Sequence, residues 1–482
     1  MKNIKRLLAM LLAVVMLLAM VACNDTTTPT EPTNNNTPTD PKPSENVTDP
    51  TDPEVVKPDL GGLQVLIANW WDNPETVPGE PTTAWAQLVY DYRQELMEEM
   101  NFSYANVGLS GTGDYMDVLV AAMLENNMNF NGFQVSVEQT PLTALVSQGL
   151  LWDLNELEGW NLDDANVWSQ TIIDYFTIGG KTYAARPGMD EPRDGIVFNK
   201  KMLADAGLDP DLPYKLLQEG KWNWENFEMI LEKTTKDSNN DGVVDVYGIV
   251  GGDNIIDMGI YTNGAMFVSK DEEGFLVDGT LDPAFQQGCE WALSLYTRGW
   301  AGKPSEGWDG AFCDFRDGKA AMVICQTWVF SKYYEGMTDD YGYIVLPAGP
   351  NGTNCCVMGP TPIAIPTNID KDTASKIGQA IYHYNNTSVI EGAEDFGKTY
   401  LDSYYKLFRD TEAVELTIDK MMTDPTCQVY DCRYLVPNFN YYNLVGPIHR
   451  QEKSVQQAIE DVRAYNQSMI DAANTLFGKP VS

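Results

Sequence analysis

The strongest constraint on the fold is an alternation of strand-like and helix-like segments that begins at Leu63. A compact apolar run over 64–68 predicts a strand, and an amphipathic pattern over 82–100 predicts the helix that follows it. The same pattern continues along the chain, with strands expected over 101–109 and 132–138 and helices over 114–127 and 141–150. Such alternation is typical of an α/β layer built on a parallel sheet.

Ligands of parallel α/β sheets bind in the crevice beyond the carboxyl ends of the strands. The residues that follow these predicted strands, or begin the next helix, are therefore candidates for one shared edge. They are Trp70, Trp71, Asp72, Asp114, Tyr115 and Glu138.

The N-terminus has the pattern of a signal peptide over residues 1–22. Lys2, Lys5 and Arg6 precede an apolar run that ends at Ala22, and this run is shorter than the roughly 20 residues that a membrane span needs. Met20 to Cys23 reads MVAC and resembles a bacterial lipobox, with Met where Leu is usual. That resemblance implies a lipid anchor on Cys23; the alternative is an ordinary secretory signal followed by a chance cysteine.

Residues 23–60 form a linker of Thr, Pro, Asn and Asp with few apolar side chains. Such a segment has too little apolar surface to offset the entropy cost of folding, and its prolines keep it extended. We expect a tether that holds a globular body, beginning near residue 61, away from a surface.

Charge and cysteine content limit the functional classes. The formal net charge of −37 disfavours binding to nucleic acid or to anionic membranes and suits an extracellular protein. Seven cysteines remain after Cys23, too few for a disulfide scaffold. A local bridge between Cys427 and Cys432 is one option, whereas Cys289 and Cys325 are expected to be buried thiols.

Motifs farther along the chain resemble the family 1 extracellular solute-binding proteins of bacterial ABC importers, which mostly carry sugars and oligosaccharides. These motifs are YAARPGMDEPRDGIVFNKKMLADAGLD, WNWENFEMILEKTTKDSNNDGVVDVYGI, NGAMF, FRDGKAAMVICQTWVF and IVLPAGPNGT, in this order. The resemblance covers roughly residues 63–477. Each motif alone is loose, but the ordered set is fairly specific.

The resemblance implies an α/β, two-lobe periplasmic-binding-protein-like fold (type II) with discontinuous, hinge-linked lobes. It places the N-lobe at 61–183 and 350–395 and the C-lobe at 184–349 and 396–482. The crossing segments are expected near Tyr183–Gly188, near Leu346–Pro350 and around Gly392–Tyr400.

The segment DSNNDGVVD, residues 237–245, matches the first part of a calcium-binding loop. Oxygen ligands would come from Asp237, Asn239, Asp241, the Val243 carbonyl and Asp245, and Gly242 would permit the sharp turn. Position 12 of the loop is Gly248, where a complete EF-hand has a bidentate Glu. A structural Ca2+ is therefore one interpretation, and a turn that caps the preceding helix is the other; no cofactor is required.

Aromatic residues form a second group of candidates. Sugars have apolar C–H faces and a rim of hydroxyls, so a sugar site needs flat aromatic rings together with charged or amide side chains. Trp152, Trp222, Trp224 and Trp291 are expected in the core. The candidate ligand contacts are Trp70, Trp71, Asp72, Tyr115, Glu138, Arg186, Asn263, Trp308, Gln326 and Trp328.

Sequence motifs give little support for an enzyme, because no nucleophile elbow, zinc-protease motif or phosphate loop is present. We expect a monomeric, lipid-anchored binding protein on the outer face of a bacterial cytoplasmic membrane. It would capture a carbohydrate by lobe closure and pass it to an ABC permease. The alternatives are a binder of a non-sugar solute such as a peptide or polyamine, a secreted carbohydrate-active hydrolase, and a surface adhesin.

Overall fold

The structure is a computed structural model that describes residues 57–71, 81–109, 113–136 and 142–479. The predicted signal peptide, the lipid-anchor residue Cys23 and most of the linker lie outside the described residues. Asp72 and Glu138 also lie outside them.

The N-lobe is built on a four-stranded sheet with the strand order β14-β3-β1-β2. Strands β1, β2 and β3 are mutually parallel, as the sequence predicted, and β14 is antiparallel to β3. The N-lobe elements are β1 (Leu63–Asn69), α2 (Ala84–Glu99), β2 (Phe102–Gly108), α3 (Tyr115–Leu124), β3 (Gly132–Gln134), α4 (Leu142–Ser147), α5 (Gln170–Phe176), β4 (Thr177–Ile178), β5 (Lys181–Thr182), β14 (Ile363–Ala364) and α12 (Lys371–Asn385).

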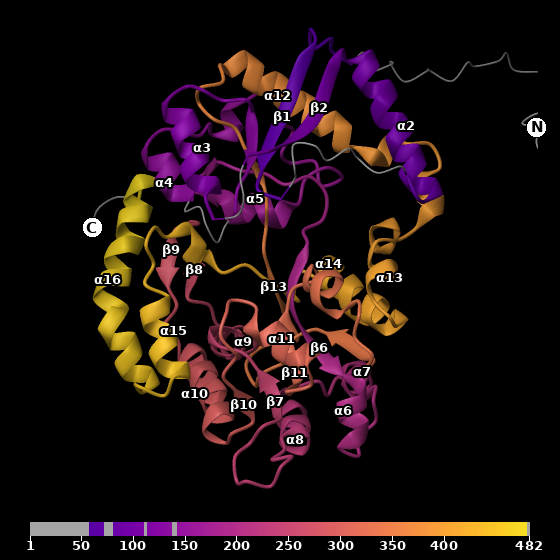
Figure 1. The fold of residues 1–482 in the computed structure, drawn as a ribbon. Helices are drawn as coiled ribbons and strands as arrows, with labels where there is room; N and C mark the ends of the chain where they lie inside the picture. The colour runs from indigo at the N-terminus through magenta and orange to yellow at the C-terminus, as the bar shows by residue number, and fades with distance from the viewer. Residues whose placement is uncertain (1–56, 72–80, 110–112, 137–141, 480–482) are drawn as a thin grey trace, which may run out of the picture. The chain divides into compact units, whose positions relative to one another are not determined.

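Helices cover both faces of this sheet, because successive residues of β1 point to opposite sides. Val65 and Ile67 pack in one cluster with Leu96 of α2 and Ile377 of α12, and Ala68 packs in another with α3. Figure 1 shows the orange helix α12 beside the indigo strands β1 and β2, so the chain returns late in the sequence to complete this lobe.

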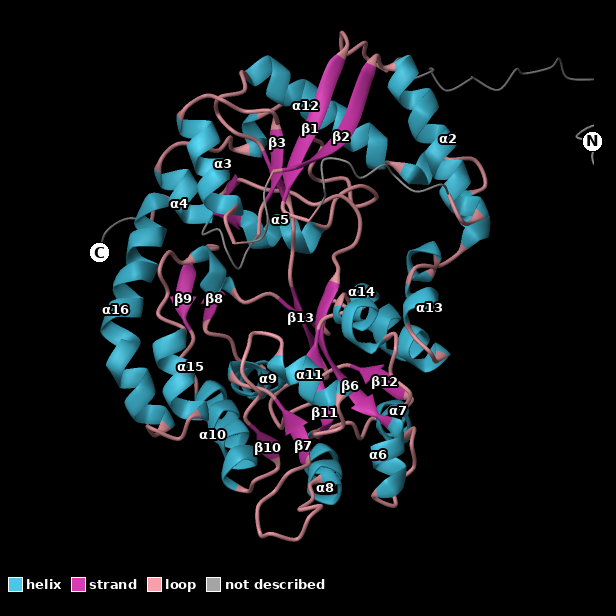
Figure 2. Cartoon of the chain, in the orientation of Figure 1, coloured by secondary structure: helices cyan, strands magenta, loops and turns pink. Residues whose placement is uncertain are grey.

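The C-lobe is built on a seven-stranded mixed sheet with the order β10-β7-β11-β6-β13-β15, and β12 also pairs with β6. Strands β10, β7 and β11 are parallel, whereas β6 runs antiparallel to β11, β12 and β13. The C-lobe elements are β6 (Pro192–Asn199), α6 (Lys200–Asp205), α7 (Leu212–Gln218), α8 (Trp224–Thr234), β7 (Tyr247–Val250), α9 (Asp253–Thr262), β8 (Val268–Lys270), β9 (Leu276–Asp278), α10 (Pro283–Thr297), β10 (Ala301–Gly302), α11 (Gly310–Arg316), β11 (Ala320–Cys325), β12 (Tyr341–Ile344), β13 (Cys356–Met358), α13 (Tyr404–Leu407), α14 (Asp419–Thr423), β15 (Gln428–Val429), α15 (Tyr442–His449) and α16 (Val455–Leu476). Figure 2 shows these helices around the lower sheet.

Local sequence signals explain several helix starts. The side chain of Asn223 accepts a hydrogen bond from the Asn226 amide and caps the start of α8. Ser454 and Gln457 form a capping box that begins α16. Asp114 precedes α3 but makes no side-chain cap hydrogen bond, so its expected capping role is not observed.

The second crossing between the lobes lies elsewhere than the sequence predicted. Ala348 bridges Asn223, and Leu346 bridges Cys355, so 346–350 belongs to the C-lobe. Because β13 pairs with β6 and β14 pairs with β3, the chain crosses between Met358 and Ile363. The predicted boundary at residue 350 is therefore wrong, because strand pairing rather than the Pro-Gly motif decides where the chain leaves the sheet.

The first crossing follows the expected segment 183–188, because Ala185 and Pro187 still bridge N-lobe residues, and the third lies between Phe396 and Tyr400. Ala185 bridges Ile363 in the N-lobe, and β6 begins at Pro192 in the C-lobe. Farther on, the Phe396 ring lies 5.3 Å from that of Trp85 near the start of α2, and the Tyr400 hydroxyl donates to Asp419 of α14.

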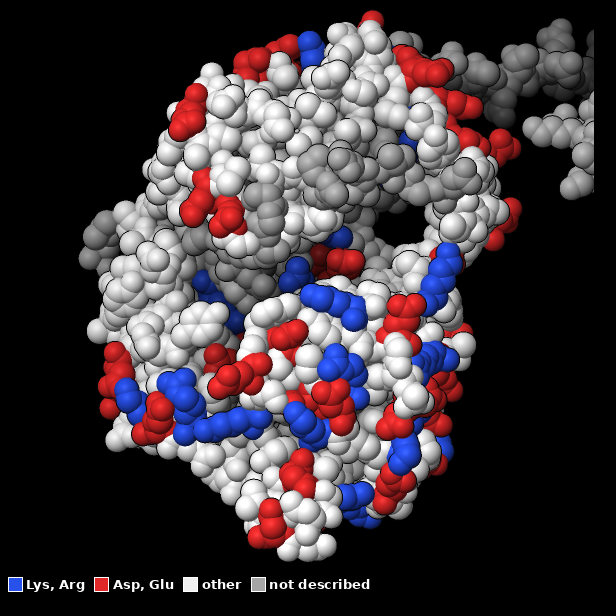
Figure 3. Space-filling view, in the orientation of Figure 1, with Lys and Arg blue, Asp and Glu red and all other residues white. Residues whose placement is uncertain are grey.

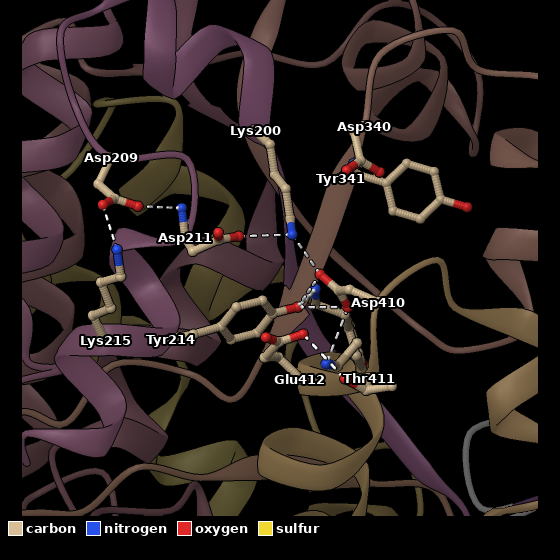
Figure 4. Close-up of polar contacts among 12 residues, drawn as sticks. Lys200, Asp209, Asp211, Tyr214, Lys215, Asp340, Tyr341, Asp410, Thr411 and Glu412 are labelled. Carbon is tan, nitrogen blue, oxygen red and sulfur yellow. Dashed lines mark hydrogen bonds and ion pairs between the residues drawn. The ribbon is translucent and has the colours of Figure 1, made fainter.

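A polar cluster joins residues 410–412, which follow the third crossing, to the C-lobe sheet (Figure 4). Lys200 Nζ lies 2.7 Å from a carboxylate oxygen of Asp211 and 2.7 Å from one of Asp410. The Tyr214 hydroxyl donates to Asp410 and accepts from the Tyr343 amide on β12. The side chains of Lys200 and Asp410 are mostly buried, so this network has a structural role.

All seven cysteines in the described part of the chain are free thiols. Cys289 and Cys325 are buried, as predicted, and burial raises the pKa of both thiols. The Cys427–Cys432 bridge that the sequence left open is not present.

Candidate functional site

A polar cavity of the C-lobe lies at the carboxyl ends of two parallel strands. Helix α9 begins directly after β7, and Gln326 directly follows β11, so both elements lie at the edge where α/β sheets bind ligands. The cavity has a volume of about 430 Å³. Its walls are formed by Asp194, Asp253, Asn254, Asp257, Gln326, Val357, Arg433, Tyr434, Val436, Asn438, Phe439, Tyr441 and Tyr442.

Helix α9 contributes three polar residues to one wall. Asp253 and Asp257 are four residues apart, so they lie on the same face of the helix with Asn254 beside them. Asp253 Oδ1 lies 2.6 Å from Nδ1 of His449. Asp257 is 8% exposed, and its Oδ2 accepts from the Tyr441 hydroxyl at 2.9 Å.

Arg433 lies opposite these carboxylates and is held by aromatic rings. Its guanidinium carbon is 4.2 Å from the centroid of the Tyr441 ring and 4.7 Å from those of Phe267 and Tyr434. Nη2 donates to Asp257 at 3.2 Å and to the Tyr434 hydroxyl at 2.9 Å, and Nη1 donates to the Tyr261 hydroxyl.

Burial decides the acid–base behaviour of this pair. Loss of water contact raises the pKa of Asp257 from 3.8 to about 6, although Arg433 and the Tyr441 hydroxyl oppose the shift. The carboxylate is therefore charged at neutral pH.

An exposed group of aromatic rings extends the site from Gln326. Trp308 is 70% exposed and Trp328 is 42% exposed, and their ring centroids lie 6.1 Å apart at 30°. Phe312 packs against both rings edge-on. We call the rings of Trp308, Phe312 and Trp328 the aromatic platform.

A π-helical turn over Phe330–Tyr334 stabilises the aromatic platform. It places Lys332 Nζ 5.0 Å from the Trp308 centroid and 5.9 Å from the Trp328 centroid. The Tyr333 hydroxyl donates to Asp309 at 2.9 Å, which fixes the loop that carries Trp308.

Gln326 connects the platform to the cavity. Its Oε1 accepts from Trp328 Nε1 at 2.5 Å and from Arg193 Nη1 at 3.4 Å, while the side chain lines the cavity. The structure therefore brings together Trp308, Gln326 and Trp328, which the sequence proposed as ligand contacts from separate motifs.

In the N-lobe, Trp70 and Trp71 follow β1 as predicted. Trp71 is 50% exposed, and its ring lies edge-on to Trp70 at 4.6 Å. Trp70 in turn packs against Tyr115 with centroids 5.2 Å apart. Trp71 thus presents an aromatic face to solvent, while Trp70 is partly covered.

Two predicted ligand contacts belong to the interior. Tyr115 is fully buried, and its hydroxyl donates to the carbonyls of Ala68 and Gln134, so it joins α3 to the sheet. Asn263 is also fully buried; its side chain donates to Ala284 and accepts from the Asn351 amide. The interpretation of Tyr115 and Asn263 as ligand contacts is wrong for this structure, because their polar atoms bind the protein itself.

Arg186 lies on the first crossing segment and bonds within it. Its Nε lies 3.4 Å from Asp190 and donates to the Met189 carbonyl, and Nη1 donates to Thr361 on the second crossing. This arrangement joins the two crossings, so Arg186 has at least a structural role.

The predicted metal loop is closed by its own hydrogen bonds. Asp237 accepts from the amides of Asp241 and Gly242, Asp241 accepts from Val243, and Asp245 accepts from Ser238. Asn239 accepts from the Asp241 amide in the same turn. No group of three or more His, Cys, Asp or Glu in the described ranges is arranged to hold a metal ion, so calcium at this loop stays a prediction.

Sequence reasoning missed much of the cavity wall. Tyr442 is 75% exposed at the cavity rim, and Asp257, Arg433 and Tyr441 form its floor. In the sequence, the signal for these cavity residues was the aromatic-rich run 439–442, which lay outside the predicted strands and helices. These residues reach the site through tertiary contacts with α9, which sequence spacing does not reveal.

Comparison with known proteins places this geometry in a family. The family model described as bacterial extracellular solute-binding protein matches residues 99–380, more than half of the chain. Among curated protein sequences, none matches this chain.

Many solved structures share the fold. The cyclic alpha-maltosyl-1,6-maltose binding protein of Arthrobacter globiformis aligns with a TM-score of 0.59 at 15% identity, over 86% of this chain and 100% of that one. The Mycobacterium tuberculosis protein UgpB, solved in complex with glycerophosphocholine, gives 0.58 at 14% identity, over 86% and 99%. The sugar-binding protein MalE of Xanthomonas citri gives 0.56 at 14% identity, over 87% and 100%.

Within the residues that the structure describes, no helix combines the length and apolar character that crossing a membrane requires. The two-lobe fold of these neighbours agrees with the two sheets joined by three crossing segments. With the family match over more than half its length, the chain belongs to the bacterial extracellular solute-binding proteins.

Proposed function

We propose that this protein captures a carbohydrate, most simply an oligosaccharide, and delivers it to the permease of an ABC transporter. The observation that carries the proposal is the exposed aromatic platform next to a polar cavity. Trp308 and Trp328 offer ring faces for the apolar faces of sugars, and Gln326 and α9 offer hydrogen-bonding groups for hydroxyls. The sugar ligands of two structural neighbours favour the same ligand class.

The proposed mechanism is a two-state closure without chemistry. A ligand that contacts both lobes favours the closed form by its differential affinity for that form. Trp71 on the N-lobe is the exposed aromatic residue that would meet the ligand from the other side. The protein acts as a monomer, no bond is made or broken, and the sugar leaves unchanged.

We also propose that Cys23 carries a lipid and that residues 23–60 tether the body to the outer face of the cytoplasmic membrane. The positively charged start, the apolar run and the following Thr/Pro/Asn-rich segment support this arrangement.

The test is a thermal-shift screen over glycans, peptides and polyamines such as spermidine. We expect a carbohydrate to raise Tm with concentration, because a ligand that binds only the folded state stabilises it by mass action. Mass spectrometry of the incubated glycan should return it intact. A response to spermidine or peptides alone, or the appearance of shorter glycans, would overturn the proposal.

The variant Trp328→Ala tests whether the aromatic platform binds the carbohydrate. Losing one stacking ring should weaken carbohydrate binding about tenfold or more in calorimetric titration. Trp300→Ala is the control, because Trp300 precedes β10 and is not among the residues that line the cavity. If wild type and Trp328→Ala bound the carbohydrate with equal affinity, the aromatic platform would not be part of the ligand site.

A further inference from the structure

Resting on the proposed function, we propose that the cavity selects a carbohydrate that carries no negative charge and that donates hydrogen bonds to an acidic wall. The acidic wall consists of Asp194 on β6 and of Asp253 and Asp257 on α9. The chemical class is thus a neutral or amine-bearing oligosaccharide, and uronic acids and sugar phosphates are rejected.

Asp257 supplies the observation that points to a ligand. It is 8% exposed and lines the cavity, and its Oδ1 has no hydrogen-bond partner among the described residues. A buried carboxylate oxygen without a donor costs free energy, so native proteins rarely leave one without purpose. This oxygen is closed to solvent in the structure, so the Asp257 side chain must turn toward the cavity before a sugar hydroxyl or amine can supply the missing donor.

The guanidinium in the cavity is unsuited to binding an anionic ligand. Arg433 already donates to Asp257, to Tyr261 and to Tyr434, and its planar faces are covered by Tyr441 and Phe267. A carboxylate or phosphate from a ligand would have to displace these internal acceptors.

The partial positive charge at the amino end of helix α9 is also offset by a carboxylate of the protein. Asp253 lies in the first turn of α9, where a carboxylate interacts favourably with the helix dipole. A ligand anion at this end would meet the Asp253 carboxylate before it reached the backbone amides. His449 beside Asp253 adds positive charge only when it is protonated.

Arg193 is the cation near the rim of the cavity, where its Nη1 lies 3.4 Å from Gln326 Oε1. Arg433 pairs with Asp257, which leaves the carboxylates of Asp194 and Asp253 beside the guanidinium of Arg193. The lining also includes the amides of Asn254, Gln326 and Asn438, which serve neutral hydroxyls as donors and acceptors. The charge of the groups around the cavity therefore favours hydroxyl-rich ligands of zero or positive charge.

The experiment measures Kd by calorimetry for glycans that differ in charge. The probes are maltotetraose and cellotetraose as neutral sugars, the glucosamine tetramer as an amine-bearing sugar, tetragalacturonate as an anionic sugar, and glycerophosphocholine as a phosphate-bearing compound. We expect a neutral or amine-bearing tetramer to bind about tenfold or more tightly than tetragalacturonate. Rejection of tetragalacturonate should weaken from about 20 mM to about 500 mM NaCl, because salt screens charge repulsion, while neutral binding changes little.

The outcomes separate this inference from the proposed function. If tetragalacturonate binds as tightly as the neutral tetramers or more tightly, the charge selection is wrong and carbohydrate capture stands. If glycerophosphocholine alone binds, or no glycan binds while spermidine or a peptide does, the proposed function fails and the inference fails with it.

Asp253→Asn tests the wall directly. It removes one charge and keeps the shape, so the ratio of neutral to anionic affinity should fall about threefold or more. Asp461→Asn is the matched control, since Asp461 pairs with Lys453 on exposed surface of α16 and lies outside the cavity. An unchanged ratio in Asp253→Asn, with folding verified by Tm, would overturn the role of the acidic wall; if the variant does not fold, the salt series on the wild type decides.

Discussion

At the scale of single residues, burial decided which predicted side chains remained available to a ligand. Trp308, Gln326 and Trp328, three of the candidate ligand contacts proposed from the sequence, lie together at one surface of the C-lobe. Tyr115 is also aromatic and was proposed as a ligand contact, but it begins α3 and lies in the core. The difference comes from packing around each side chain, which no local sequence pattern reports.

Asp257→Asn should change the pH dependence of stability in the ligand-free protein. Burial raises the pKa of Asp257 to about 6, with Arg433, Tyr441 and Asp431 as the charged or polar groups nearest to it. A raised carboxyl pKa contributes stability that is fully present below pH 3.8 and is lost as pH rises through about 6. The free energy of unfolding of the wild type relative to Asp257→Asn should therefore fall by about 1–3 kcal/mol between about pH 4 and pH 7.5.

Urea denaturation at several pH values measures this difference. Removing the carboxylate also leaves Arg433 with fewer acceptors, but that cost is constant with pH because Arg stays charged. A parallel pH profile for the two proteins would contradict the assigned environment of Asp257. Asp461→Asn, on exposed surface, should parallel the wild type.

At the scale of elements, periodicity and capping residues predicted most helices and strands, whereas pairing partners came only from the structure. The strand over 64–68, the helix over 82–100 and the helix over 114–127 are all present. The second crossing was misplaced because β13 continues the C-lobe sheet past the Pro-Gly turn. Which strand pairs with which depends on contacts distant in sequence.

Removal of calcium tests whether the loop over 237–245 binds this metal ion. Its Asp and Asn oxygens accept backbone amides in a tight turn around Gly242, and the same turn geometry could order them around Ca2+. We expect calcium to raise Tm of the metal-free protein by about 1–3 °C and a chelator to reverse the change. Differential scanning calorimetry measures the shift.

Asp241→Asn should abolish the calcium response, and Asp205→Asn on the exposed face of α6 should leave it intact. A wild-type Tm that calcium leaves unchanged would favour the alternative interpretation, in which the loop is only a hydrogen-bonded turn after α8.

At the scale of the whole molecule, contacts distant in sequence join the lobes. Lys270 on β8 donates to the carbonyls of Tyr175 and Thr177 at the end of α5, each at 2.8 Å. The Tyr175 hydroxyl donates to the carbonyl of Asp431, two residues before Arg433. The cavity is therefore linked through one short chain segment to a contact between the lobes.

On one face of the molecule, Lys and Arg are distributed unevenly. On the face seen in Figure 3, most Lys and Arg lie over the C-lobe, intermixed with Asp and Glu. Ion pairs between exposed side chains of the C-lobe, such as Lys201 with Asp205 and Lys453 with Asp461, contribute little to stability.

Cys23→Ala tests the attachment of the whole molecule to the cell. Without the lipid-bearing thiol, the exported protein should appear in the medium instead of the membrane fraction, as measured by fractionation and immunoblotting. Cys313→Ala, a partly exposed cysteine of α11, should remain with the membrane. Membrane retention of Cys23→Ala would contradict the proposed anchor.

The sequence by itself determined the α/β class, most element positions and the family, because hydrophobic periodicity and ordered motifs are local properties of the chain. Only the tertiary structure decided which side chains form the cavity, where the second crossing lies and why Asp257 holds an unusual proton affinity. These features depend on burial and on pairing between segments such as α9 and 433–442, which lie roughly 175 residues apart. Desolvation and packing act through space, so they become visible only once the chain is folded.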